Sequence, residues 1–140
     1  IFWSVGEHCI CCAKEAAARG LSNRLVLACL LHDASECYMS DVPRPFKKMI
    51  PAYTEQEEKL LHLIYMKYLG SDLSEDEEKK LKEIDDDFLW YDLKELLHEP
   101  QLGDEPKIHI EWQYRFRPFS EVEKEYLDLF KRFSGKCQER

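Results

Sequence analysis

The fold expected for this chain rests on the stretch Ser22-Asn-Arg-Leu-Val-Leu-Ala-Cys-Leu-Leu-His-Asp33. Ser22 or Asn23 can cap a helix that is apolar on nearly every side over residues 25–31 and continues to about Tyr38. Such a helix has no face suited to water, so other elements have to cover it all round. We expect it to be the most buried helix of an all-α fold.

Four more helices are expected around this one. A run rich in Ala and Cys from Glu7 to Arg19 ends at Gly20, a residue that is common just after helix ends. Further along, Ser or Thr is followed three residues later by Glu at three places, which predicts a capping box and a helix start at each. These pairs are Thr54 with Glu57, Ser74 with Glu77, and Ser120 with Glu123.

Two stretches lack helical periodicity and are expected to be loops. Pro43 and Pro45 restrict the backbone after Asp41, so a rigid loop should follow the apolar helix. Residues 99–119 contain three prolines and a glycine, which predicts a loop, with a short extended piece at 108–112. The sequence therefore predicts about five helices in one domain.

Composition narrows the class of protein. The chain has 140 residues, 28 of them acidic and 20 basic, and its net charge of −8 disfavours broad binding to nucleic acids or anionic lipids. No apolar run approaches the roughly 18 residues of a membrane span and no leader peptide is visible, so we expect a cytoplasmic protein. Because the chain opens at Ile1 rather than at Met, we also expect that a segment precedes it.

Six cysteines raise the question of disulfides. Four of them, Cys9, Cys11, Cys12 and Cys29, sit among apolar residues on helix-patterned segments, which indicates small buried thiols. The Cys9-x-x-Cys12 pair has no second pair at zinc-site spacing, and we interpret it as structural.

Ionisable residues interrupt the apolar helix near its C-terminal end. His32 and Glu36 are one turn apart on one face and Asp33 lies about 100° round the helix, so three such groups converge. Buried charges are costly unless they are paired or bind a metal. His8 and the run 85–87 could supply further ligands, although a single histidine is more often a hydrogen-bonded core residue and a triple Asp a solvated face.

The three aspartates of the run 85–87 do not share one face. Asp85 lies on the side of the helix that carries Phe88 and Leu89, so it should point inward, whereas Asp86 and Asp87 should be more solvated. Asp85 is therefore the first candidate for a ligand and Asp86 the second.

Four motifs follow one another along the chain: Ser4-Val-Gly-Glu-His8, Leu30-Leu-His-Asp-Ala-Ser-Glu36, Asp41-Val-Pro-Arg-Pro-Phe-Lys47 and Glu83-Ile-Asp85. Their order and spacing resemble those of HD-domain metal-dependent phosphohydrolases, above all the bacterial 5'-deoxynucleotidases and the phage-associated HD hydrolases related to them. The resemblance implies a single HD domain over residues 1–140, with the motifs in a core at about 3–97 and a C-terminal loop and helix, 99–134, packed on it.

The resemblance also implies roles for individual residues. It implies that one divalent metal ion is bound by His8, His32, Asp33 and Asp85, and that the acidic catalytic residues are Glu36 and Asp41. Two imidazoles and two carboxylates suit Mn, Co, Ni, Fe or Zn better than Mg or Ca. Such an ion would lower the pKa of bound water and polarise a phosphoryl group, while Glu36 or Asp41 transfers protons.

Three residues are candidates for binding the substrate. Arg44 and Lys47 are placed to bind a phosphate, although ordinary surface charge explains them nearly as well. Trp3 could stack on a base or sugar, or simply pack. The family also has an Arg a dozen or more residues before its first His, and this chain starts only seven residues before His8. No role is assigned to His62, His98 and His109.

The function implied by the resemblance is hydrolysis of a phosphate monoester, with a nucleoside 5'-monophosphate or a similar small phosphate as substrate. Two alternatives stay open. The same site could cleave a phosphodiester or a pyrophosphate, or the chain could be a binding module that keeps the scaffold without turnover; loss of Glu36 or Asp41 would be the sign of the latter. A homodimer is compatible with the sequence, whereas a membrane partner and general nucleic-acid binding are not expected.

Overall fold

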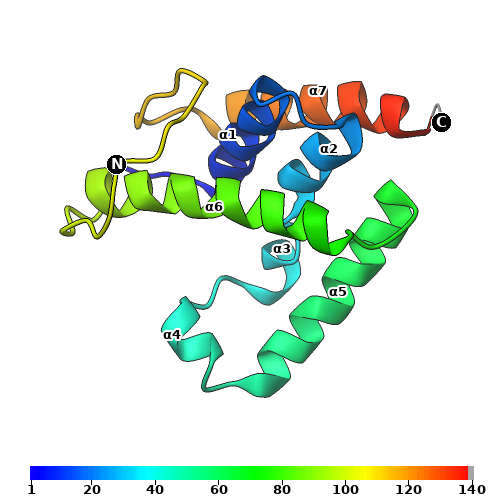
Figure 1. Ribbon diagram of the computed structural model, residues 1–140, viewed down its shortest axis with the longest axis horizontal. Helices are drawn as coiled ribbons and strands as arrows, with labels where there is room; N and C mark the ends of the chain where they lie inside the picture. Colours follow the sequence, from blue (N-terminus) through cyan, green and yellow to red (C-terminus); the bar gives the residue numbers. More distant parts are fainter. Residues whose placement is uncertain (139–140) are drawn as a thin grey trace.

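The computed structural model describes residues 1–138, and its regular structure is entirely helical over that range (Figure 1). Five helices have nine residues or more: α1 (Val5–Ala18), α2 (Asn23–Leu31), α5 (Pro51–Leu69), α6 (Glu75–Glu95) and α7 (Phe119–Gln138). Two single-turn helices, α3 (Glu36–Met39) and α4 (Arg44–Lys47), lie between α2 and α5. The all-α prediction is confirmed, and the five longer helices correspond to the five expected.

The central position of α2 follows from its apolar surface. Every residue from Leu25 to Leu31 is buried, as expected for a helix without a polar face. The helix packs most extensively against α1 and α7 and also contacts α5 and α6. Its N-cap is Ser22, whose hydroxyl accepts a hydrogen bond from the backbone N–H of Leu25 at 3.1 Å.

The prediction that this helix continues to Tyr38 is wrong, because α2 ends at Leu31. Nδ1 of His32 lies 2.6 Å from the carbonyl oxygen of Cys29, the acceptor that the N–H of residue 33 would use in a continuous α-helix. Tighter turns follow, in which the N–H of Ala34 donates to the carbonyl of Leu31. The His-Asp pair therefore occupies a turn rather than the middle of a helix.

Helix starts were predicted correctly in some places and wrongly in others. Ser74 and Glu77 form the expected capping box of α6, and an unpredicted one, Ser4 with Glu7, begins α1. Thr54 lies inside α5, which begins at Pro51 because proline suits the first helical position. The prediction of Ser120 as an N-cap is also wrong, since α7 already begins at Phe119.

One apolar core joins the five longer helices. Besides α2 it contains residues of α1, Tyr65 of α5, Ile84 and Phe88 of α6, and Val122 and Phe133 of α7. The four cysteines expected to be buried thiols are buried and free, which confirms that prediction. Within residues 1–138, none of the helices combines the length and the apolar content that a membrane crossing requires.

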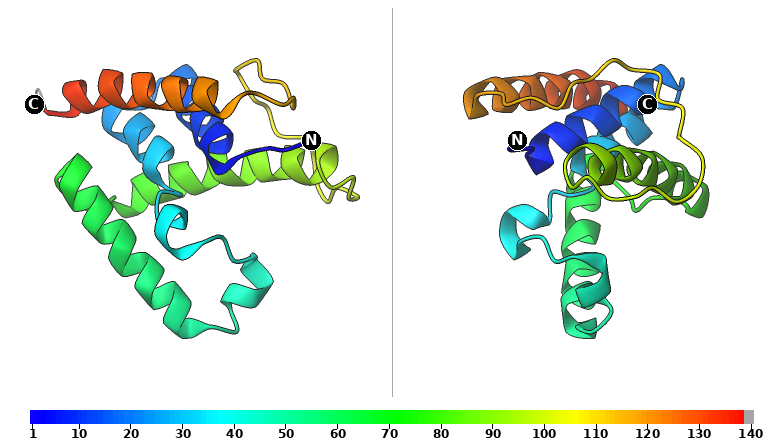
Figure 2. Two further views of the ribbon diagram at one scale, coloured as in Figure 1. Left: turned by 180° about the vertical axis from the view of Figure 1, so that it is seen from behind. Right: turned by 90° about the vertical axis from the view of Figure 1, so that its left-hand side faces the viewer.

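Two segments extend from this core and frame the site. The α3–α4 segment and most of α5 project to one side of α6, away from α7 (Figures 1 and 2). Residues 98–118 connect α6 to α7 and form no strand, and their side chains alternate between half-buried and exposed over 108–112. Glu15 of α1 anchors this connection by accepting hydrogen bonds from the N–H groups of His109 and Ile110 at 2.7 and 3.2 Å.

Candidate metal centre

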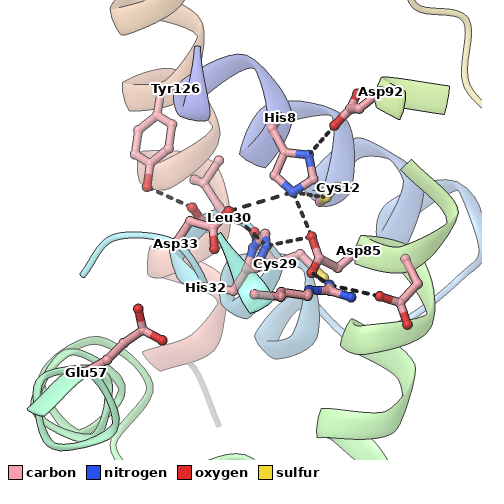
Figure 3. Close-up of polar contacts among 12 residues, drawn as sticks. His8, Cys12, Cys29, Leu30, His32, Asp33, Glu57, Asp85, Asp92 and Tyr126 are labelled. Carbon is pink, nitrogen blue, oxygen red and sulfur yellow. Dashed lines mark hydrogen bonds and ion pairs between the residues drawn. The ribbon is translucent and has the colours of Figure 1, made fainter. Parts of the chain in front are cut away.

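His8 and Asp85 come from different helices and meet at the middle of the candidate site (Figure 3). The capping box of Ser4 and Glu7 starts α1 at Val5, so His8 lies in the first turn of this helix, and its ring points toward α6. Nε2 of His8 lies 2.8 Å from Oδ1 of Asp85. The inward orientation predicted for Asp85 from its helix face agrees with this contact.

His32 approaches the same carboxylate from the end of α2. Its Nε2 lies 3.3 Å from Oδ1 of Asp85. Its Nδ1 faces the carbonyl oxygen of Cys29, which only accepts hydrogen bonds, so Nδ1 carries a hydrogen. In the neutral ring Nε2 then holds a lone pair directed at carboxylate oxygens, an arrangement that requires a proton or a cation between them.

Asp33 completes the set of ligands implied by the sequence. Its Oδ2 lies 3.3 Å from Nε2 of His32 and 3.7 Å from Nε2 of His8. The four residues thus converge from α1, the turn after α2, and α6. The donor atoms of His8, His32 and Asp85 lie within 4.8 Å of one another, as the ligands of one ion would, and Asp33 approaches the two imidazoles beside them. This mixed donor set suits a divalent transition metal.

A thiol also lies in this cluster. Sγ of Cys12 is 3.6 Å from Nε2 of His8, and the donor atoms of His8, Cys12, His32 and Asp85 all lie within 4.8 Å of one another. Cys9, His32 and Asp33 form a second such group. Both cysteines had been predicted from the sequence to be structural.

A carboxylate lies behind the ring of His8. Oδ2 of Asp92 lies 3.7 Å from Nδ1 of His8, on the opposite side of the ring from Asp85 (Figure 3). The hydroxyl of Tyr114 donates a hydrogen bond to Oδ1 of Asp92 at 2.6 Å. Carboxylates behind metal-binding histidines commonly fix the ring and its tautomer in this way. The connection 98–118 therefore contributes to the site through Tyr114.

Contacts within the cluster lower the pKa of Asp85 and raise the pKa of His32. Burial alone would raise the pKa of Asp85, but hydrogen bonds and charge from His32 and His8 hold it far below its ordinary value. Burial lowers the pKa of His32, yet Cys9 and the carboxylates of Asp85 and Asp33 raise it well above its ordinary value. The site thus favours positive charge on or between its imidazoles.

A pocket of about 290 Å³ opens beside the cluster. Seven of the nine residues proposed from the sequence line it: Trp3, His8, Asp33, Glu36, Asp41, Arg44 and Asp85. His32 lies behind this wall and is only 8% exposed. A larger pocket of about 800 Å³, between α1, the start of α7 and residues 110–117, shares Trp3 with the first but contains none of the candidate metal ligands.

The two acidic residues expected to act in catalysis both line the smaller pocket. Burial, followed by the neighbouring charges of Asp33 and Asp41, raises the pKa of Glu36 to about 8. A carboxyl group with this pKa carries its proton at neutral pH and can donate it.

The three candidate substrate residues differ in their placement. The guanidinium of Arg44 lies at the pocket, 3.0 Å from Asp86 and 3.4 Å from Asp85. Lys47 instead contacts the carboxylate of Glu57 at 3.2 Å and does not line the pocket. Trp3 packs against the ring of Tyr114, with the ring centroids 4.7 Å apart.

Three residues near the metal ligands were missed by sequence reasoning, although two of them had a signal. Cys12 follows His8 by four residues, the spacing that places two side chains on one helix face. Asp92 follows Asp85 by seven residues, two helical turns along the same face. Tyr114 had no signal, because its partner lies in α6 and only the folded connection brings them together.

The fold and the site together define an all-α protein with a candidate metal centre. No protein-family model matches the chain, and no solved structure matches it at a significant level. The chain is similar to the uncharacterized protein YfdR of Escherichia coli K12, with 34% identity over 67 residues. This match covers 48% of the chain and 35% of YfdR, so it spans only about a third of that relative's length.

Proposed function

We propose that this chain is a metal-dependent phosphohydrolase of the HD type, acting on phosphate monoesters such as nucleoside 5'-monophosphates. The observation that carries the proposal is the convergence of His8, His32 and Asp85, with donor atoms 2.8 and 3.3 Å apart, beside a pocket lined by further acidic residues. This arrangement supports the ligand set and the catalytic carboxylates that the four sequence motifs imply.

The donor set fits a divalent cation held by His8, His32, Asp33 and Asp85. A cation bound there supplies Lewis acidity for activating water and for stabilising charge on phosphoryl oxygens. The residues themselves are preorganised, because the Cys29 carbonyl fixes one ring and Asp92 lies behind the other. The site would therefore bind the ion without much rearrangement.

Proton transfer is assigned to the acidic residues on the pocket wall. Glu36, whose pKa is raised to about 8, would donate a proton to the leaving alkoxide of the ester. Asp41, which lines the same pocket and carries charge that raises the pKa of Glu36, would accept a proton from the attacking water.

Arg44 is the residue placed to bind the phosphate. Its side chain is 56% exposed, and its contacts with Asp85 and Asp86 hold the guanidinium at the pocket. Arginine binds phosphate through two parallel hydrogen bonds, so the group would gain partners when substrate enters. A cavity of about 290 Å³ lies at the small end of ligand pockets, which favours a small phosphate ester over a polymer.

The proposal is tested by phosphate release from a panel of ribo- and deoxynucleoside monophosphates, with Mn²⁺, Co²⁺, Ni²⁺, Zn²⁺ or Mg²⁺ added to metal-stripped protein. We expect activity on 5'-monophosphates that requires a transition metal. A phosphodiester and a pyrophosphate in the same panel test the alternative bond types. Stoichiometric metal binding without hydrolysis of any member would instead favour a non-catalytic binding module.

Two variants separate metal binding from chemistry. Asp33→Ala should abolish metal binding, whereas Glu36→Ala should keep the metal and lose turnover. Glu58→Ala, which removes an exposed carboxylate from α5, is the matched control and should change neither. Metal analysis of the purified variants checks this, and an Asp33→Ala protein with stoichiometric metal would show that the scheme is wrong.

A further inference from the structure

The thiol of Cys12 occupies the buried side of the candidate metal centre. Cys12 lies one turn after His8 on α1, so both side chains leave the helix on the same face. Its side chain is 1% exposed, and it does not line the pocket. Asp33, by contrast, lines the pocket and approaches the two imidazoles from that open side.

The spacing of the donor atoms matches that of ligands around one ion when one of them is sulfur. With metal–nitrogen and metal–oxygen bonds of about 2.0–2.1 Å and a metal–sulfur bond of about 2.3 Å, two ligands separated by roughly the tetrahedral angle lie about 3.3 Å apart for N and O and about 3.6 Å apart for N and S. The observed separations are 3.3 Å between His32 and Asp85 and 3.6 Å between His8 and Cys12. The 2.8 Å between His8 and Asp85 is shorter and has the length of a hydrogen bond.

We propose that Cys12 is a further ligand of the metal ion, which binds the ion from the buried side and joins His8, His32, Asp33 and Asp85. This inference rests on the metal centre of the proposed function and specifies its chemistry. On binding, a metal–sulfur bond forms, the S–H bond of Cys12 breaks and the proton passes to solvent. A thiolate among the ligands selects Zn²⁺, Co²⁺ or Fe²⁺ over Mn²⁺ and Mg²⁺.

Because Cys12 is buried, its thiol can act as a ligand only when a cation lies beside it. The side chain of Cys12 is buried, and burial disfavours the charged form of a thiol, so the sulfur is neutral unless a positive charge lies beside it. A divalent ion is the largest local charge in such a site and deprotonates a coordinating thiol outright.

The test is a Co²⁺ titration of the metal-stripped full chain, carried out in a background with Cys37→Ser and Cys137→Ser, which removes the exposed thiol of Cys37 and the cysteine near the C-terminal end of the sequence. We expect a sulfur-to-cobalt charge-transfer band in the near ultraviolet that saturates at one Co²⁺ per chain, together with the visible bands of bound Co²⁺. Cys12→Ser should remove the ultraviolet band and weaken Co²⁺ binding by at least about tenfold, while affinity for Mn²⁺ changes less.

Cys11→Ser is the matched control, because this buried thiol is adjacent in sequence and lies outside the cluster. The band should survive in that variant. A band lost in Cys9→Ser but kept in Cys12→Ser would overturn the proposal and assign the thiolate to the second group. X-ray absorption of the Zn²⁺-loaded chain, which needs no variant, should show one sulfur neighbour at about 2.3 Å.

The outcomes separate this inference from the proposed function. Stoichiometric Co²⁺ binding with visible bands but no sulfur band would overturn the role of Cys12 and leave the nitrogen and oxygen centre intact. Failure to bind any of the transition metals would overturn both proposals.

Discussion

Nε2 of His8 lies 2.8 Å from Oδ1 of Asp85, although 77 positions separate these residues in the chain. The contact joins the first turn of α1 to the middle of α6. Because Asp85 also reaches Nε2 of His32 at 3.3 Å, one carboxylate organises both imidazoles of the candidate centre. The behaviour of the site should therefore depend strongly on this side chain.

Replacing Asp85 by Asn keeps the shape of the side chain and removes its charge. Mutation of a residue that only orients a metal ligand typically lowers metal affinity by roughly 10- to 100-fold. Because this change removes the charge of a ligand itself, we expect the affinity for Zn²⁺ to fall by more than that. Isothermal titration calorimetry measures the effect. Asp86→Asn is the control, since Asp86 contacts Arg44 and Lys82 instead of the rings. Equal affinities in the two variants would contradict the assignment of Asp85.

Removing the hydroxyl of Tyr114 tests the layer behind His8. In Tyr114→Phe, Asp92 loses the hydrogen bond of 2.6 Å that orients it, and metal affinity should fall by about tenfold. Tyr126→Phe is the comparison, because its hydroxyl donates to the carbonyl of Leu30 at 2.8 Å and does not contact Asp92. If metal titrations show the same loss in both variants, the effect is general destabilisation and Tyr114 has no positioning role.

Glu15 should make the stability of the fold depend on acid. Its side chain is fully buried, and although burial raises its pKa, hydrogen bonds from Arg19 and His109 outweigh this and lower the pKa below 4.5. A lowered folded-state pKa stabilises the fold above the unfolded value of about 4.5, and this contribution is lost as the pH falls through the folded value. Urea unfolding at a series of pH values should show the decline.

The variant Glu15→Gln isolates this contribution. We expect it to lower the free energy of unfolding by about 2 kcal/mol at pH 7 and to flatten the decline below pH 4.5, since charge-assisted hydrogen bonds from Arg19 and His109 are weakened. Glu58→Gln, on the exposed surface of α5, should leave the curve unchanged. A Glu15→Gln curve parallel to that of the unmodified chain would exclude titration of Glu15 as the cause.

Ser74 and Thr54 both have the sequence pattern of an N-cap, but only Ser74 caps a helix, so their alanine variants should differ in stability. Ser74→Ala removes a hydroxyl that accepts from the N–H of Glu77 at 3.1 Å and should cost about 1 kcal/mol. Thr54→Ala changes a residue that the sequence pattern marks as an N-cap but that lies inside α5, so a capping loss is not expected. Thermal unfolding of the two variants distinguishes the cases, and equal losses would mean that α5 begins near Thr54 after all.

Local patterns predicted the parts of the fold that depend on neighbouring residues. The apolar surface of residues 25–31 predicted the central helix, the Ser74–Glu77 pair predicted the start of α6, and helix periodicity selected Asp85 from three consecutive aspartates. These features could be predicted because each is set by spacing within one element, where 3.6 residues per turn relates sequence to direction.

Contacts between elements decided what local patterns could not. Helix α2 ends at Leu31, where the ring of His32 makes a hydrogen bond with the carbonyl oxygen of Cys29. The other nitrogen of that ring contacts Asp85 of α6. Lys47, expected at a phosphate, instead pairs with Glu57 of α5. In both cases several local conformations were available, and packing selected one of them.

The sequence by itself determined an all-α chain with one buried helix, and it contains the motifs that imply His8, His32, Asp33 and Asp85 as metal ligands. Only the tertiary structure brought Tyr114 behind Asp92 and the thiol of Cys12 into the cluster of imidazoles and carboxylate. The physical reason is that helix periodicity sets the direction of a side chain relative to its own axis. The position of one helix relative to another depends on how the whole core packs.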